Sequence, residues 1–73
     1  MSRVAAIGEE TRLAGYALAG VDIYAASGAD QYRAAWTRLP GDVGLVVLTS
    51  AARAALGSQL AGRPQLLWVV TPD

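Results

Sequence analysis

The chain has 73 residues, six basic and six acidic side chains, and no cysteine, histidine or lysine. The missing residue types exclude disulfide frameworks, nearly all zinc, haem and iron–sulfur sites, nucleophile–histidine pairs and a phosphate-loop lysine. The zero net charge provides no basic field for nucleic acid or anionic lipid, so we expect one domain over 1–73 that is not an enzyme and binds no cofactor or metal.

The first third of the chain predicts a strand, a helix and a second strand. An apolar run over 4–7 ends at Gly8, which is typical of a buried strand followed by a turn. A helix is expected from Thr11 to Gly20, since apolar residues recur at helical spacing, at Leu13, Ala14, Ala17 and Leu18. The β-favouring run over 21–25 predicts the second strand.

The next segment predicts an amphipathic helix. One face of that helix carries apolar residues at i, i+3, i+4 and i+7, namely Tyr32, Ala35, Trp36 and Leu39. Asp30 lies near its positive end, and Pro40-Gly41 ends it.

The last part of the chain predicts a strand, a helix and a final strand. The Val/Leu run over 43–48 is typical of a central parallel strand that is covered on both faces. Thr49 or Ser50 can cap the next helix, whose apolar stripe is Ala52, Ala55, Leu56 and Leu60. Gly57 weakens the interior of this helix, and Gly62 and Pro64 close it. The run over 66–70 predicts the fourth strand.

This alternation predicts an α/β fold: a small open four-stranded parallel sheet with three helices, in the flavodoxin-like order 2-1-3-4. Sheets of this design usually carry a further helix after the last strand. We therefore expect one face of the fourth strand, over 66–70, to be covered by a partner, by a second copy or by residues outside this sequence.

Ligands of open parallel sheets bind beyond the carboxyl ends of the strands, where this chain places Glu9, Glu10, Thr49, Ser50 and Asp73. The two glutamates invite comparison with receiver domains, but Thr49 stands where the phosphoacceptor aspartate would be. The glutamates are more simply explained as acids near a helix N-terminus. A dinucleotide-binding turn is not predicted either, because Glu10 occupies the position of its second glycine.

Three aromatic residues are the candidate partner-interface residues: Tyr16, Tyr24 and Trp68. Tyr16 lies off the apolar stripe of the first helix, whereas Tyr24 and Trp68 belong to strands near the sheet margins. Exposed aromatic side chains can anchor a partner, although a partly covered surface position explains each of them singly. Arg12, Arg33, Arg38 and Arg53 are dispersed over polar helix faces, which indicates solvated surface rather than a binding patch.

Three segments together resemble the F-subunit family of the V-type (vacuolar/archaeal-type) ATPases. Residues 7–21, IGEETRLAGYALAGV, are similar to the opening of that family, which has Ile-Gly, an acidic stretch and then Gly-aromatic-x-Leu-Ala-Gly. Residues 42–49, DVGLVVLT, look like its Asp-Ile-Gly-Ile-Ile-Leu-Ile-Thr segment, and Pro64 with the later Thr71-Pro72 is similar to its final strand. The chain departs from the family at Thr11 and Arg12. The family continues past its last strand into a C-terminal helix, which is expected either to lie outside this sequence or to be absent from a short member of the family.

The resemblance implies a non-catalytic central-stalk subunit that docks on the coiled-coil stalk subunit and couples ATP hydrolysis or synthesis in the head to ion transport. Its expected location is cytoplasmic and peripheral to the membrane through the complex, without direct membrane insertion, because the longest apolar runs are far below the ~20 residues of a spanning helix. A receiver-like signalling or protein-interaction module without a phosphoacceptor is the alternative. Self-association of the isolated chain stays open.

Overall fold

The computed structural model describes residues 3–17 and 20–71. Eight elements follow one another: β1 (Arg3–Gly8), α1 (Glu10–Ala17), β2 (Asp22–Ala25), α2 (Ala29–Arg38), β3 (Val43–Leu48), α3 (Ser50–Leu56), the 3-10 helix η1 (Gly57–Gly62) and β4 (Leu67–Val70). No helix in this part of the chain has the length and apolar character that crossing a membrane requires.

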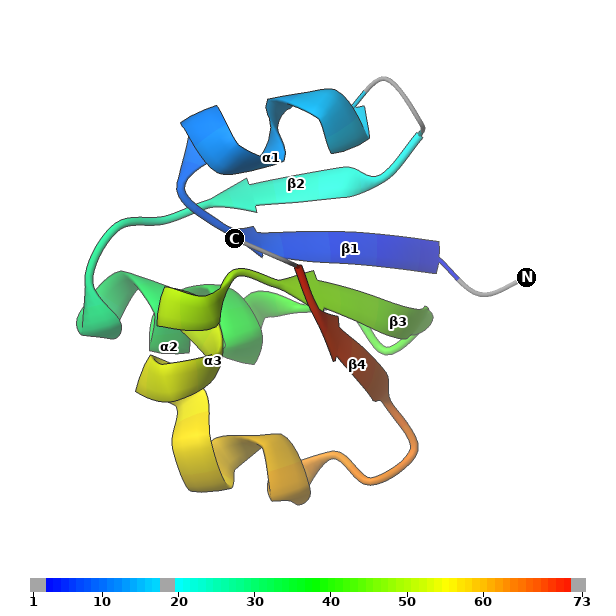
Figure 1. Cartoon of the computed structure of the whole chain (residues 1–73). Coiled ribbons are helices and arrows are strands. Elements are labelled where there is room, and N and C mark those ends of the chain that lie inside the picture. The colour runs from blue at the N-terminus through cyan, green and yellow to red at the C-terminus, as the bar shows by residue number, and fades with distance from the viewer. Residues whose placement is uncertain (1–2, 18–19, 72–73) are drawn as a thin grey trace.

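The four strands form one parallel sheet in the order β2-β1-β3-β4 (Figure 1). Strand β1 pairs with β2 on one side and with β3 on the other, and β4 pairs with β3. The predicted α/β fold and its 2-1-3-4 order are therefore confirmed. Strands β2 and β4 are the edges of the sheet, as expected for Tyr24 and Trp68.

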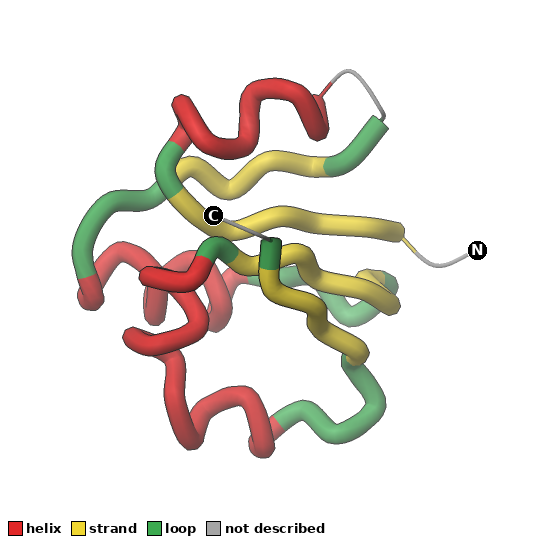
Figure 2. The backbone as a smooth tube through the Cα atoms, in the orientation of Figure 1, coloured by secondary structure: helices red, strands yellow, loops and turns green. Residues whose placement is uncertain are grey.

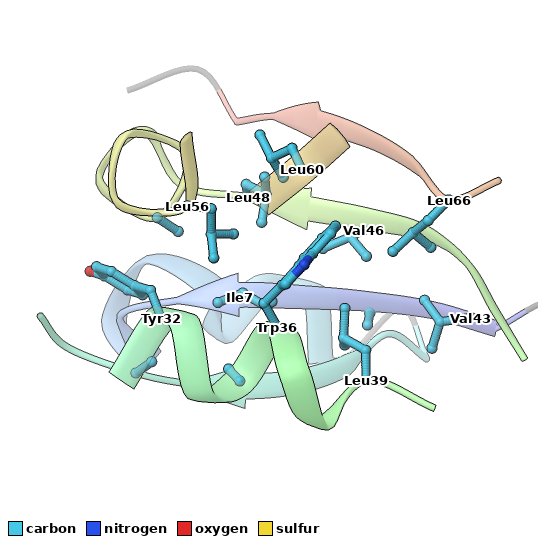
Figure 3. Close-up of a cluster of buried hydrophobic side chains, with 14 residues drawn as sticks. Ile7, Tyr32, Trp36, Leu39, Val43, Val46, Leu48, Leu56, Leu60 and Leu66 are labelled. Atoms are coloured by element: carbon cyan, nitrogen blue, oxygen red, sulfur yellow. The ribbon is translucent and has the colours of Figure 1, made fainter. Parts of the chain in front are cut away.

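Helices α2 and α3 cover one face of the sheet, and α1 lies on the opposite face (Figure 2). The main core lies under α2 and α3 and combines the predicted α2 stripe with inward-facing strand residues. Figure 3 shows Trp36 of α2 reaching toward Val46 of β3, and Leu39, which directly follows the helix, belongs to the same cluster. The four predicted stripe residues are all buried: Tyr32, Ala35, Trp36 and Leu39.

The face under α1 has a smaller core. Leu13 is fully buried there against Ala6 and Val47, and Tyr16 packs half-buried against this cluster. The prediction that Tyr16 lies off the buried side of its helix is wrong, because α1 turns Leu13 and Tyr16, three residues apart, toward the sheet while Ala14 stays exposed. The side chain of Ala17 and the whole of Leu18 lie outside the described residues.

Helix α3 is shorter than the apolar stripe predicts. It ends at Leu56, because Gly57 takes a φ of 47°, in the left-handed region that glycine adopts without strain. The chain continues as η1, which still brings Leu60 into the main core. The turn over 63–66 then leads into β4, so that η1 lies next to β4 and both elements line one hollow.

Candidate functional site

The crevice between the carboxyl ends of β1 and β3 is filled by protein. A Cβ atom built on Gly8 would overlap the Cγ2 atom of Thr49 and lie 2.8 Å from its Oγ1 atom. Only glycine lets the two strand ends approach this closely. The Thr49 side chain, which is 2% exposed, therefore occupies the place where ligands of such sheets usually bind.

Thr49 also caps the following helix, as the sequence predicts. Its Oγ1 atom accepts a hydrogen bond of 3.2 Å from the backbone N–H of Ala52, which satisfies an otherwise free amide in the first turn of α3. The Thr49 hydroxyl thus has a structural role at the position where a receiver domain carries its aspartate.

The two glutamates after β1 border a shallow hollow of about 280 Å³ between the ends of β1 and β2. Both side chains are exposed, and Glu10 begins α1, where a carboxylate is favoured by the helix dipole. Within residues 3–17 and 20–71, no three or more carboxylate, cysteine or histidine side chains are grouped so that they could hold a metal ion. Asp73, the remaining acid predicted at this edge, lies outside the described residues.

The three predicted interface aromatics do not lie together. Tyr16 packs on the α1 side of the sheet, and Tyr24 packs half-buried against the main core from the β2 edge. Trp68 lies on β4, at the opposite edge of the sheet, and is 36% exposed. Their participation in an interface stays a prediction, and they cannot form one continuous patch.

Strand β4 is more exposed than the other three described strands. All four of its residues are exposed, with Leu67 at 68% and Val69 at 48%. These two side chains share a sheet face with the half-buried Leu45 of β3, because Leu45 pairs with Leu67 and residues two apart lie on one face. We call Leu45, Leu67 and Val69 the open sheet face. It lies on the α1 side of the sheet, beyond the small core around Val47.

The other side of β4 borders a second feature, a hollow of about 620 Å³ between η1 and the strand. Its walls include Leu60, Leu66 and Trp68 together with two arginines, Arg53 and Arg63. The guanidinium of Arg53 lies 5.5 Å from the ring centre of Trp68, and that of Arg63 lies 5.5 Å from the ring centre of Trp36. Both distances are typical of cation–π contacts. We call this hollow the arginine groove.

The described ion pairs lie away from the arginine groove. Arg3 lies between Asp22 and Asp42 at the start of the sheet, at 3.9 and 3.5 Å, and Arg33 pairs with Asp30 on α2 at 3.1 Å. These partners are about half or more exposed, so the pairs contribute little stability. No described carboxylate lines the arginine groove.

The sequence patterns do not reveal the arginine groove. They predict a solvated helix face for Arg53 and nothing for Arg63, because both side chains meet their tryptophans only after α3 and η1 fold back along β4. The apolar run over 66–70 does predict the strand, on which the structure leaves Leu67 and Val69 exposed, and what covers them stays a prediction.

Comparison with known proteins gives no relatives: no family model, curated protein or solved structure matches this chain. What the fold shows is the class, an α/β Rossmann-like domain.

Proposed function

We propose that this chain is a non-catalytic subunit of the central stalk of a V-type rotary ATPase. It docks on a coiled-coil stalk subunit of the D type and takes part in coupling ATP hydrolysis or synthesis to ion transport, on the cytoplasmic side of the membrane. The observation that carries the proposal is the open sheet face, where Leu67 and Val69 present apolar side chains to solvent. The partner is suggested by the resemblance of 7–21 and 42–49 to the F-subunit family.

A helix is the element that fits such a face. In layered α/β folds a sheet face is covered by helices, and here α1 covers only the part of its face around Ala6 and Val47. A coiled coil offers a long helical surface to lie beside α1 on the rest. Fully burying a leucine or valine side chain contributes about 1.5–3 kcal/mol, so the open sheet face can supply a large part of a binding energy.

The receiver-like alternative draws no support from the carboxyl edge of the sheet. The residue that follows β3 is Thr49, whose hydroxyl accepts the amide of Ala52 and whose methyl group contacts Gly8. A phosphorylation switch needs an accessible acceptor at that point, and Thr49 is buried, so this edge offers only a receiver-like module without a phosphoacceptor.

Leu67→Asp is expected to prevent assembly without unfolding the domain. A carboxylate at this position would have to be desolvated in the interface, so the expected loss is about 2 kcal/mol or more of binding free energy. The chain should be co-expressed with the D-type stalk protein of a V-type ATPase and the complex measured by size-exclusion chromatography and calorimetry. Unfolding by urea should change little, because Leu67 is 68% exposed in the isolated domain.

Ala51→Asp is the matched control. It adds the same charge at an exposed position in the first turn of α3, far from the open sheet face. The control should bind the coiled-coil stalk protein like the unaltered chain. Failure of the unaltered chain to bind would refute the proposed function, and equal binding by Leu67→Asp would show that the open sheet face is not the docking surface.

A further inference from the structure

Strand β4 has a backbone edge to which no other described strand is paired. It is the last strand in the sheet order, and β3 is its neighbour among the strands of residues 3–17 and 20–71. The N–H of Thr71 donates to the carbonyl of Leu48 at 2.8 Å. In a parallel ladder alternate residues face alternate sides, so Leu67, Val69 and Thr71 face β3, whereas Trp68 and Val70 direct their backbone N–H and C=O groups outward. Such an edge can accept an added strand.

The two sides of this edge differ in chemistry. On one side lie the apolar side chains of the open sheet face, Val69 and Leu67, of which Leu67 also borders the arginine groove. On the other side lies the arginine groove, where Arg53 rests over Trp68 and Arg63 follows at the start of the turn into β4. The guanidinium of Arg53 is held over Trp68 in the groove, whereas that of Arg63 is held over Trp36, which does not line the groove. Neither arginine is ion-paired with a described carboxylate.

We propose that the edge of β4 binds an extended segment of a partner protein in which acidic and apolar residues alternate. Side chains of an added strand point alternately to the two sheet faces. The acidic residues then meet Arg53 and Arg63, and the intervening apolar residues extend the surface of Leu67 and Val69. The backbone of the segment pairs with the outward groups of Trp68 and Val70.

Charge favours this occupant over a second copy of the chain. If two copies paired their β4 strands about a two-fold axis perpendicular to the sheet, the two sheets would join edge to edge. The same face of each copy would then lie on the same side of the joined sheet. The Arg53 and Arg63 side chains of both copies would then share one face, and β4 itself, Leu-Trp-Val-Val, brings no carboxylate to them. A segment with alternating carboxylates supplies the missing countercharges.

Binding at this edge does not require that the partner be a stalk protein, and its test needs only the isolated chain. The probe is a short capped peptide that alternates valine and glutamate, titrated into the chain while tryptophan fluorescence is followed. We expect saturable binding that weakens as salt rises.

The variant with Arg53→Gln and Arg63→Gln together should lose affinity at least about tenfold, because two charge-assisted contacts are removed. The control is Arg33→Gln, which alters an exposed arginine on α2 that lies outside the groove. This variant should bind the peptide within about twofold of the unaltered chain.

Strand addition has its own readout in amide hydrogen exchange. Bound peptide should slow exchange at Trp68 and Val70, while Thr71, already bonded to Leu48, should change little. Several results would overturn the proposal: equal binding of a valine–lysine peptide, unchanged affinity of the double variant, or no slowing at Trp68 and Val70. A dimer of the chain alone that excludes the peptide would also overturn it.

Leu45→Asp separates the two proposals. This substitution alters the open sheet face on β3, one strand away from the outward backbone edge of β4. It should therefore weaken binding of the coiled-coil stalk protein and leave peptide binding intact.

Discussion

Replacing Trp36 by alanine is expected to lower the free energy of unfolding by about 3–5 kcal/mol. Trp36 is 4% exposed and lies at the centre of the main core, where Figure 3 shows it directed at Val46. A domain of this length has a total stability of roughly 4–11 kcal/mol. The variant should therefore lose a large share of the stability of the domain and unfold at a distinctly lower urea concentration.

The measurement is urea unfolding followed by far-ultraviolet circular dichroism, because the substitution removes one of the two tryptophan fluorophores. Trp36→Phe is the control, since it retains an aromatic ring in the same cavity and should lose distinctly less stability. A loss below about 1 kcal/mol for Trp36→Ala would contradict the placement of this side chain in a close-packed core.

Gly8→Ala is expected to destabilise the domain by about 2 kcal/mol or more, although it adds one methyl group. The added Cβ would overlap the Cγ2 atom of Thr49, and both residues are buried where β1 and β3 end. Relief requires that the two central strands separate, which would disturb the closest-packed part of the sheet.

Two further variants identify the cause of that loss. Gly15→Ala, in helix α1, meets nothing within 4 Å and should leave stability unchanged or raise it by up to about 1 kcal/mol. Thr49→Ala removes the atoms that the new methyl group would strike, so it should recover part of the stability lost by Gly8→Ala in the double variant. If Gly8→Ala and Gly15→Ala unfold at the same urea concentration, the contact between Gly8 and Thr49 does not constrain the fold.

Much of the fold follows from local patterns in the sequence. The spacing of Tyr32, Trp36 and Leu39 specifies a helix face regardless of what that face packs against. The unbroken apolar run of β3 indicates a strand covered on both faces, which requires a central place in a parallel sheet. Thr49 is a predictable cap because its side chain can serve the amides of a helix that begins directly after it.

Features that depend on how elements pack could not be read in the same way. Helix α3 ends at Leu56, although the apolar stripe continues to Leu60, because the positive φ of Gly57 redirects the chain. Tyr16 is drawn against the small core by the rotation of α1 on the sheet. The pairing of Arg53 with Trp68 joins residues from different elements, and nothing in the spacing between them indicates a contact.

The candidate site likewise has features that the sequence predicts and features that depend on how the strands pair. A fourth strand could be predicted from its apolar run, and the structure leaves all four residues of β4 exposed. The identity of the exposed residues required the register of β4 against β3, which turns Leu67 and Val69 to one face and Trp68 to the other. The aromatic residues expected to form the interface are instead distributed between both sheet faces and both edges.

The most direct test of the proposed docking is a methyl spectrum of leucine- and valine-labelled chain, recorded while the D-type stalk protein of a V-type ATPase is added. We expect the signals of Leu45, Leu67 and Val69 to shift together and saturate. The signals of Leu56 and Leu60, which lie in the main core under the opposite face, should move little. Shifts confined to the main-core leucines, or an unchanged spectrum at saturating stalk protein, would contradict the claim that this chain binds a stalk through the open sheet face.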